Sequence, residues 1–499
     1  MEQIQGTLKV FFKKMVIKNA FLFIVVFLFV NCKSERHKRL DSMLLTSADV
    51  LESKGDSIFG DTHSPYTNHR FYKPIFPNRF INISSGENIQ SAIDSMAQMG
   101  GGYVVLEAGV HISKRIILKS NINLQIGQGA ELVFKSEIED FLPVVFTRNE
   151  GIELYSLGAC IYANNVENIA ITGKGKIIGP GEGSVRRKTM THEVIEKIVD
   201  YTKAVEDRIY DGRTEDFIFP PALIAPINCK NVLIEGVSLE RSAFWNVVPT
   251  YCENVIIRGL TINSVGIQRG DGIDIESSID VLIEYCVFNT GDDCIALKAG
   301  RGYDGLRVNR PTENVIVRHC LAKQGHGGLT IGSETAGMVR NVYVHDCVFD
   351  GVDVGIRFKT RRPRGGGGEN MLFENIRMRV NHSAIRWDML GQAMHVGKLA
   401  DRNYKVIPDR LTPKFQNIRI KNVVIENAED CIKIQALPES PLMNVIIQDV
   451  IAKGKNWLSA SDVVGLELSN VELSVENNAI DTVNVSGLKL SNISQHNNL

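Results

Sequence analysis

The sequence predicts an all-β chain, folded as a single-stranded right-handed parallel β-helix with one capping helix at its N-terminal end. Two observations support this prediction: a short strand-like unit recurs along the chain, and 43 glycines among 499 residues suit many tight turns. A repeat of this kind cannot bury its apolar side alone, so successive repeats are expected to stack with their parallel strands paired. The stack is therefore expected to form one long domain.

Each repeat opens with Asn or Asp and continues with three mostly apolar residues. Most copies recur after roughly 23 to 34 residues. The first residues of the copies are Asn168, Asn231, Asn254, Asp280, Asn314, Asn341, Asn370, Asn417 and Asn444. Asn and Asp tolerate the left-handed backbone conformation and hydrogen-bond to nearby backbone, so these positions are predicted to form turns between strands.

Three segments lie outside this repeat. Ser84 and Glu87 have the spacing of a capping box, so a helix is expected to start there and to end at the glycines of residues 100–102. Residues 191–210 have a helical apolar pattern and are predicted to form an amphipathic helix inserted between coils. Residues 361–369 contain three arginines and a glycine run, and are expected to form a mobile loop. Insertions in a solenoid often lie on the binding face, although surface decoration explains both equally well.

The N-terminus has the pattern of an export signal. Lysines precede the apolar run of residues 20–30, which is too short to span a bilayer comfortably and is followed by Asn31 and Cys32. This pattern resembles a bacterial lipoprotein signal with Cys32 as the lipidated residue; plain secretion and a retained anchor are the alternatives. We expect residues 1–32 to direct export, 33–75 to form a linker and 76–499 to form the β-helix domain. The protein is expected to be exported and lipid-anchored in the bacterial envelope, in the periplasm or at the outer-membrane surface, or else secreted.

Composition narrows the range of partners. The formal net charge is −1 and the chain has no long basic stripe, so no nucleic-acid partner is expected. Membrane contact is expected only through the lipid anchor, and the protein is expected to be a monomer. The remaining cysteines have no CxxC pair and no metal-ligand spacing, which favours stacked buried thiols over a disulfide framework. They are Cys160, Cys229, Cys252, Cys286, Cys294, Cys320, Cys347 and Cys431.

Charged residues recur at intervals of about one coil, which predicts a site on one face of the stack. They are Asp271, the pair Asp292 and Asp293, His326, and Arg357 with Lys359. Coils are about 4.8 Å apart, and a lateral offset between strands is expected to widen a carboxylate pair toward the roughly 6.5 to 9.5 Å of an inverting glycosidase. Such an enzyme needs one protonated and one ionised carboxyl group. Because crowded carboxylates cannot all ionise easily, one pKa is expected to rise.

Each of these residues also has a purely structural interpretation. Aspartates in glycine-rich turns commonly form turns or caps, and His326 between glycines could be a turn residue. Arg357 and Lys359 lie two positions apart and therefore point to the same side of a strand. They could belong to a solvated charged face, or they could clamp the carboxylate of an acidic sugar.

These residues make the chain similar to the polygalacturonases, the pectin-cleaving glycoside hydrolases of family 28, and in particular to their bacterial exported branch. The resemblance runs from about residue 81 to about residue 475. It includes the glycine-rich residues 100–109, residues 244–262, Gly291-Asp292-Asp293-Cys294-Ile295-Ala296-Leu297-Lys298, and Ile331-Gly332-Ser333-Glu334. The family motifs are Asn-Thr-Asp, Asp-Asp, Gly-His-Gly and Arg-x-Lys, and the family fold is the pectin-lyase-like parallel β-helix.

The resemblance implies hydrolysis of α-1,4-galacturonosyl linkages of pectin with inversion, and it implies no metal and no cofactor. Asp292 would be the general acid, while Asp271 and Asp293 would hold and activate the attacking water. His326 would tune the protonation of the acid. Arg357 and Lys359 would bind a galacturonate carboxylate.

Two features bear on the substrate. Arg269 and Gly270 stand where the family usually has Asn and Thr, so Arg269 is expected to bind a further acidic substituent of the substrate. Residues 300–305, together with 309–311, resemble an extended loop of bacterial relatives that often act from chain ends. Exo action is therefore expected.

The sequence is also compatible with three other functions. A hydrolase of rhamnogalacturonan or another branched pectin is the closest alternative. A pectate lyase shares the architecture and could use clustered aspartates to bind calcium. The third alternative is a non-catalytic surface lipoprotein that captures pectic fragments.

Overall fold

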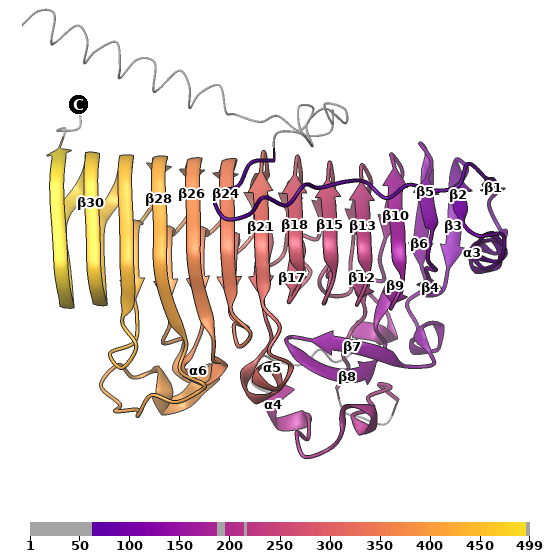
Figure 1. The fold of residues 1–499 in the computed structure, drawn as a ribbon, viewed down its shortest axis with the longest axis horizontal. Coiled ribbons are helices and arrows are strands. Elements are labelled where there is room, and N and C mark those ends of the chain that lie inside the picture. Colours follow the sequence, from indigo (N-terminus) through magenta and orange to yellow (C-terminus); the bar gives the residue numbers. More distant parts are fainter. Residues whose placement is uncertain (1–61, 187–194, 214–216, 496–499) are drawn as a thin grey trace, which may run out of the picture. The chain divides into compact units, whose positions relative to one another are not determined.

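The computed structural model describes residues 62–186, 195–213 and 217–495, all within one compact unit (Figure 1). The export segment and Cys32 lie outside these residues, so lipidation at Cys32 stays a prediction. No helix in this described part of the chain is long and apolar enough to cross a membrane.

Parallel strands stack in columns, with each strand pairing with its counterpart in the next coil (Figure 1). The first column contains β1 (Phe80–Ile83), β2 (Gly102–Leu106), β5 (Ile122–Ile126), β10 (Glu167–Gly173), β13 (Lys230–Glu235), β15 (Glu253–Arg258), β18 (Ile279–Glu284), β21 (Thr312–Arg318), β24 (Val339–Asp350), β26 (Gly367–Arg379), β28 (Lys414–Asn427) and β30 (Leu442–Gln495). The second contains β3 (Gly109–Ser113), β6 (Ala130–Phe134), β11 (Lys176–Ile178), β14 (Ser238–Glu240), β16 (Thr261–Asn263), β19 (Val287–Asn289) and β22 (Leu321–Gln324).

The third column lies next to the clustered aspartates of the sequence. It contains β17 (Ile273–Glu276), β20 (Ile295–Lys298), β23 (Gly327–Gly332), β25 (Val354–Lys359), β27 (Ser383–Asp388) and β29 (Asp430–Gln435). Isolated bridges through Val247 connect β17 to a three-stranded parallel sheet of β4 (Ile116–Ile117), β9 (Ala159–Asn164) and β12 (Ala222–Ile227). An antiparallel hairpin, β7 (Val145–Asn149) and β8 (Ile152–Ser156), projects beside this column (Figure 1).

Helices are few and short among the residues that the structure describes. They are α3 (Ile89–Gln98), α4 (Ile195–Ile198), α5 (Gly302–Val308) and α6 (Ala393–Val396), with 3₁₀ turns at Ile138–Phe141, Ser184–Arg186, Val205–Asp207, Arg362–Arg364 and Gly397–Ala400. Four residues of α3 are buried against the first coils, which confirms a capping helix at the N-terminal end.

Stacked apolar side chains form one continuous core along the coils. In the first column the same inward position is occupied in register by Ile171, Ile234, Ile257, Ile283, Val317, Val344, Phe373, Ile420 and Ile447. All of them are at most 3% exposed. Burying each such side chain contributes about 1.5 to 3 kcal/mol of stability. The apolar residues that recur with the sequence period therefore supply the energy that holds the coils together. The eight cysteines named above are also buried and none forms a disulfide, as predicted.

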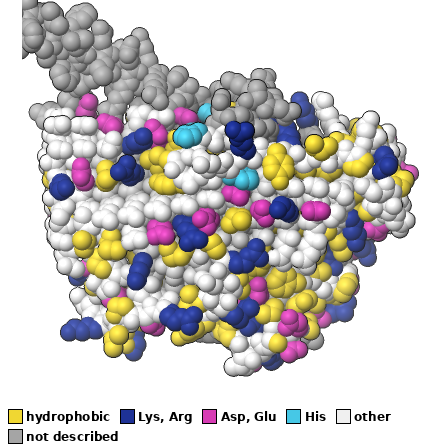
Figure 2. Space-filling view, viewed as in Figure 1, with side chains coloured by type: hydrophobic (Ala, Val, Ile, Leu, Met, Phe, Trp, Pro, Cys, Tyr) yellow, Lys and Arg dark blue, Asp and Glu magenta, His cyan; other side chains and the backbone are white. Residues whose placement is uncertain are grey.

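The outer surface is polar and mixed in charge. On the face shown in Figure 2, acidic and basic side chains are interspersed along the stack, with apolar side chains between them. This mixture matches the formal net charge of −1. The charges that matter for function are therefore found in local groups rather than in an overall field.

The left-handed conformation predicted for the repeat-opening residues is confirmed, but these residues lie inside the strands of the first column rather than in turns between strands. All nine repeat-opening residues have φ between 52° and 58°. Their side chains form a ladder along the stack: Asn231 Nδ2 donates to Asn168 Oδ1 at 2.8 Å, and Asn444 Nδ2 donates to Asn417 Oδ1 at 3.1 Å. The ladder is interrupted between Asn254 and Asp280, where the ring of His69 contacts both side chains instead.

The described part of the segment expected to form a linker, residues 62–75, packs against the stack. Residues 62–75 run along the outer side of the first column (Figure 1). Phe71 is only 4% exposed and packs with Leu233 and Ile256. The aromatic side chain therefore fixes this segment to the stack.

The helix start predicted at Ser84 and Glu87 is also wrong. Those two residues form a turn before the helix, in which the Ser84 N–H donates to Glu87 Oε2. The cap is Asn88, whose extended backbone precedes the first helical residue and whose Oδ1 accepts from the Ser91 N–H at 3.0 Å.

The insertion at 191–210 is not one long helix within its described residues, 195–210. Only Ile195–Ile198 is α-helical. Asp200 Oδ1 accepts hydrogen bonds from both the N–H and the hydroxyl of Thr202, which favours a turn over a further helical turn. The apolar pattern still has a structural cause, because Ile195 and Val199 are buried in one cluster with Leu154.

The loop expected at 361–369 is instead held by buried ion pairs. Arg362 is 4% exposed and donates to both carboxylate oxygens of Glu439, at 2.7 and 3.1 Å. Strand β26 begins at Gly367, so the glycine run ends in a strand. The expectation of a mobile loop was wrong because a sequence pattern does not show which carboxylate an arginine will pair with.

Candidate active site

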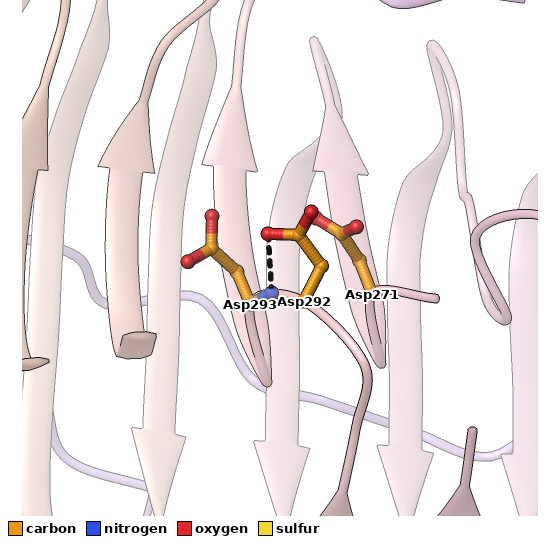
Figure 3. Close-up of side chains that lie close together, drawn as sticks. All are labelled: Asp271, Asp292 and Asp293. Atoms are coloured by element: carbon orange, nitrogen blue, oxygen red, sulfur yellow. Dashed lines mark hydrogen bonds between the residues drawn. The ribbon is translucent and has the colours of Figure 1, made fainter. Parts of the chain in front are cut away.

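Three aspartates lie in the turns that precede two neighbouring strands of the third column (Figure 3). Asp271 precedes β17, and Asp292 with Asp293 precedes β20. The Gly272 N–H donates to the Asp293 carbonyl at 2.9 Å, which joins the two turns directly. One carboxylate oxygen from each aspartate lies within 4.8 Å of the others. The predicted single face is therefore confirmed for these residues.

The expected widening of the carboxylate pair is wrong. Strands β17 and β20 pair in register, with Ile273 opposite Ile295, so no lateral offset separates the two turns. One oxygen of each carboxylate lies within 4.8 Å of the others, whereas the two carboxyl groups of inverting glycosidases are usually roughly 6.5 to 9.5 Å apart. Their spacing reflects the distance between coils.

The next coil brings His326 and Gly327 against the aspartates. The His326 N–H donates to the Asp292 carbonyl at 3.0 Å, and the Cys294 N–H donates to the Gly327 carbonyl at 2.8 Å. A Cβ on Gly327 would lie 2.2 Å from Thr330 Oγ1 and 2.7 Å from Asp293 Oδ1. Only glycine allows β23 to approach Asp293 this closely.

Two cations from β25 bind the innermost aspartate. Arg357 Nη1 lies 3.3 Å from Asp293 Oδ1, and Lys359 Nζ lies 2.9 Å from Asp293 Oδ2. Burial raises the pKa of Asp293, but the charges of Lys359, Arg357 and Lys298 outweigh it and hold that pKa below its usual value. Asp293 is therefore an ionised carboxylate at neutral pH.

Asp292 and His326 form an ion pair at the edge of the site. His326 Nδ1 lies 3.1 Å from Asp292 Oδ1. Burial alone would raise the pKa of Asp292, but the His326 hydrogen bond and nearby positive charge lower it. The same hydrogen bond raises the pKa of His326 above 6.5. The imidazole is 55% exposed and the Asp292 side chain 16% exposed, so a ligand can reach this pair.

The pKa of Asp271 is shifted upward, opposite to the pKa values of Asp292 and Asp293. Asp271 is 3% exposed, and its Oδ1 has no hydrogen-bond partner among the described residues. Burial, together with the negative charges of Asp274 and Asp292, raises the pKa of Asp271 well above 3.8. The expected rise of a carboxyl pKa is confirmed, and of the three aspartates Asp271 is the one most readily protonated.

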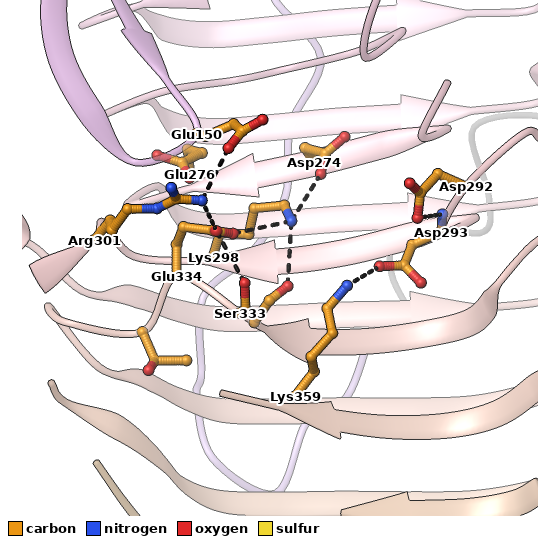
Figure 4. Close-up of polar contacts among 12 residues, drawn as sticks. Glu150, Asp274, Glu276, Asp292, Asp293, Lys298, Arg301, Ser333, Glu334 and Lys359 are labelled. Carbon is orange, nitrogen blue, oxygen red and sulfur yellow. Dashed lines mark hydrogen bonds and ion pairs between the residues drawn. The ribbon is translucent and has the colours of Figure 1, made fainter. Parts of the chain in front are cut away.

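A buried ionic network adjoins the aspartates and was missed in the sequence (Figure 4). Lys298 Nζ lies 3.5 Å from Asp274 Oδ1 and 3.2 Å from Glu334 Oε2. Burial lowers the pKa of Lys298, but Glu334 and Asp274 raise it well above 10.5. Charged residues at outward positions of otherwise apolar strands, such as Asp274 and Lys298, were the available signal.

The same network encloses Arg269. This side chain is 4% exposed and its Nη1 lies 2.9 Å from Glu150 Oε1. Glu150 in turn pairs with Arg301, which also reaches Glu334 at 2.8 Å. Arg269 therefore does not present the open guanidinium that was expected to bind a further acidic group of the substrate. Its guanidinium instead forms an ion pair with Glu150, which lies at the tip of the β7–β8 hairpin.

Carboxylate oxygens of Asp271, Asp292 and Asp293 are close enough together to bind a metal ion. Both oxygens of Asp293 are already contacted by Lys359 and Arg357, whose positive charges oppose a cation there. The arrangement is better suited to proton transfer, because it combines an ionised carboxylate, a protonated carboxyl and a third carboxylate at the solvent edge.

Comparisons with known proteins agree with this geometry. The model of "Glycosyl hydrolases family 28" matches residues 144–389, which contain all the aspartates, His326 and both cations of β25. A "Probable polygalacturonase" of Vitis vinifera is 25% identical over 77% of this chain and 75% of that protein. An "Exo-poly-alpha-D-galacturonosidase" of Dickeya chrysanthemi is 26% identical over 68% of this chain and 59% of that protein. The crystal structure of an exopolygalacturonase from Thermotoga maritima is 30% identical, covers 80% of this chain and 93% of that chain, and has a TM-score of 0.69. This likeness confirms the predicted parallel β-helix.

Proposed function

Because this chain belongs to the glycosyl hydrolases of family 28, we propose that it hydrolyses α-1,4-galacturonosyl linkages of pectin by single displacement with inversion. One observation supports this most strongly: three carboxylates meet within 4.8 Å, and two cations bind one of them. The relatives named exo-poly-alpha-D-galacturonosidase and exopolygalacturonase support both the substrate and cleavage from the chain end.

Asp292 is proposed as the general acid, although in the free protein Asp271 is more readily protonated than Asp292. The two carboxyl groups are coupled, so the proton belongs to the pair rather than to one residue. A bound sugar would cover the exposed edge of Asp292, and burial raises the pKa of a carboxyl group. Transfer of the proton to Asp292 would leave Asp271 ionised, beside an already ionised Asp293. These two carboxylates would then hold and activate the attacking water.

Arg357 and Lys359 are proposed to bind the carboxylate of the sugar on the leaving-group side. Their side chains are 19% and 20% exposed, so both have surface left beyond their contacts with Asp293. A second carboxylate at this position would be bound by charge-assisted hydrogen bonds. A neutral sugar would have no equivalent interaction.

Exo action is proposed because segments from three parts of the chain are joined on the N-terminal side of the site. The β7–β8 hairpin, α4 and α5 lie on the same side of the stack (Figure 1). Arg208 Nη1 donates to Asp304 Oδ1 at 2.8 Å, and Asp304 Oδ2 accepts from the Glu153 N–H at 2.9 Å. We propose that these contacts, with the Glu150 and Arg301 pair, block the substrate chain after one sugar.

Export, with lipidation of Cys32, and a monomeric state are also proposed. A polymer of pectin cannot enter a cell, so its hydrolase must act outside the cytoplasm. The Cys32→Ser variant tests the anchor: it should appear in the soluble fraction and lose incorporation of a labelled fatty acid. Equal membrane retention of this variant would contradict the anchor.

The substrate proposal is tested with a panel of homogalacturonan, rhamnogalacturonan and branched pectic oligosaccharides. We expect galacturonic acid as the earliest product from homogalacturonan. A ladder of long oligomers would contradict exo action, and cleavage confined to rhamnogalacturonan would contradict the proposed linkage. Binding without cleavage, unchanged in Asp292→Asn, would favour a non-catalytic binding protein.

A further inference from the structure

Side chains on the third column form an outward row that continues past the aspartates toward the C-terminal coils. The row is Thr330, Arg357, Arg386 and Lys433, one residue from each of β23, β25, β27 and β29, paired in register. On β27 the neighbours Ile385 and Trp387 belong to the core, so Arg386 between them points outward. Three consecutive coils therefore each present a cation on the same face as the site.

The cations of this row become more exposed with distance from Asp293. The side chain of Arg357 is 19% exposed, that of Arg386 28% and that of Lys433 35%. A row of charges leading out of a catalytic site is suited to an extended polyanion rather than to a single anion.

Arg386 has capacity for an additional partner. Asp388, on the same strand, lies 3.6 Å from Arg386 Nη2, beyond hydrogen-bond distance. Arg386 Nε is buried and has no hydrogen-bond partner in the part of the chain that the structure describes. Lys433 differs, because it donates to Asp430 at 3.0 Å. Arg386 is therefore the stronger candidate for binding an external carboxylate.

We propose that Arg386 forms a second carboxylate-binding subsite, one coil beyond Arg357, for the uronic acid that follows the leaving-group sugar. The proposal rests on the proposed hydrolase function. Neighbouring strands are about 4.8 Å apart, and a uronic-acid polymer carries one carboxylate per sugar, so successive coils can bind successive sugars. The planar guanidinium can bind a carboxylate through two parallel hydrogen bonds.

Chain-length dependence tests this subsite. We take one sugar to lie on the non-reducing side of the cleaved bond. The last sugar of digalacturonate then lies at Arg357, whereas the last sugar of trigalacturonate lies at Arg386. The Arg386→Gln variant should lower kcat/KM for trigalacturonate by about tenfold, mainly through KM, with a much smaller loss for digalacturonate. Arg386→Lys should recover part of the loss, because it restores the charge without the two parallel hydrogen bonds. Added salt should weaken the wild-type preference for the longer substrate.

Arg419→Gln is the matched control. Arg419 is an exposed arginine on β28, which belongs to the first column rather than the third, and its removal should leave the preference for trigalacturonate unchanged. Equal losses on both substrates in Arg386→Gln, or no loss on either, would overturn the subsite. No hydrolysis of any galacturonate oligomer by the wild-type protein would instead overturn the function on which it rests.

Discussion

His326 Nδ1 lies 3.1 Å from Asp292 Oδ1, at the exposed edge of an otherwise buried group of carboxylates. The contact lowers the pKa of Asp292 and raises that of His326. A protonated imidazole therefore keeps Asp292 ionised in the free protein. Entry of the substrate changes this balance, because the sugar covers the pair and excludes water from it.

Activity should depend on the protonation of His326. Because its pKa is raised above 6.5, the imidazolium is present below that raised pKa and is lost as the pH rises through it. Loss of the imidazolium removes a positive charge from the exposed edge of a site proposed to bind an acidic substrate, so we expect kcat/KM to fall on the alkaline side of this value. The His326→Asn variant should lose the alkaline limb and have a lower maximum. An unchanged pH profile in this variant would contradict a role for the charge of His326 in the reaction.

Asp271 and Asp293 should have opposite effects on stability when each is replaced by asparagine. The pKa of Asp271 in the folded protein is raised above its ordinary value of 3.8, so the folded protein loses stability as the pH rises from 3.8 through the raised pKa. The Asp271→Asn substitution removes the carboxyl group and therefore this loss of stability. The lowered pKa of Asp293 means that its carboxylate stabilises the fold above 3.8, and the Asp293→Asn substitution removes this gain. At pH 7 we expect Asp271→Asn to keep or raise the Tm and Asp293→Asn to lower it.

Activity gives the matching measurement for these variants. Both should lose about 100-fold or more in kcat, because both carboxylates face the proposed water. Retention of wild-type kcat in Asp271→Asn would exclude it from the reaction. A lower Tm for Asp271→Asn than for Asp293→Asn would contradict the assigned protonation states.

Gly327→Ala should impair catalysis with little change at the substrate cations. The added Cβ would lie 2.7 Å from Asp293 Oδ1, so the carboxylate must move. Displacement of a catalytic group by about 1 Å can cost about 100-fold in rate. Steady-state kinetics should show the loss in kcat, and a wild-type kcat would show that Asp293 tolerates the shift.

Arg269→Met should destabilise the protein rather than change its substrate. Loss of the guanidinium leaves the buried Glu150 with one cation fewer, and breaking a buried pair typically costs about 3 to 5 kcal/mol. Urea unfolding measures this loss. Activities on homogalacturonan and on branched oligosaccharides should fall in the same proportion, whereas a selective loss on branched substrates would restore Arg269 as a substrate-binding residue.

Chelation of divalent metal ions should leave activity intact. Lys359 and Arg357 occupy the oxygens of Asp293 that a cation would need. Assay after treatment with EDTA, with and without added Ca²⁺, checks this expectation. Loss on chelation and recovery with Ca²⁺ would favour a lyase, whose product would carry a double bond.

The repeat could be predicted from the sequence because its cause is local. Asn or Asp at the left-handed position and alternating apolar residues in the strand recur in most coils, so the period shows both the bends and the stacking core. The coil spacing then placed Asp271, Asp292, His326 and Arg357 on one face without knowledge of the structure.

The ionic network could not be predicted in this way. Glu150, Arg269, Arg301 and Glu334 come from four separate segments, and their pairing depends on where a hairpin and a short helix lie against the stack. The sequence pattern also treats any arginine in a glycine-rich segment as exposed. Burial of Arg269 and Arg362 reversed that interpretation, because their partners lie far away in sequence.

The anomeric form of the first product tests the central claim most directly. Trigalacturonate can be hydrolysed in an NMR tube with enough enzyme to cleave it before mutarotation is complete. We expect initial formation of the β-anomer, without an unsaturated product, and no such signal with Asp292→Asn. Initial formation of the α-anomer, as the close carboxylates would suggest by themselves, would contradict single displacement by a water held between Asp271 and Asp293.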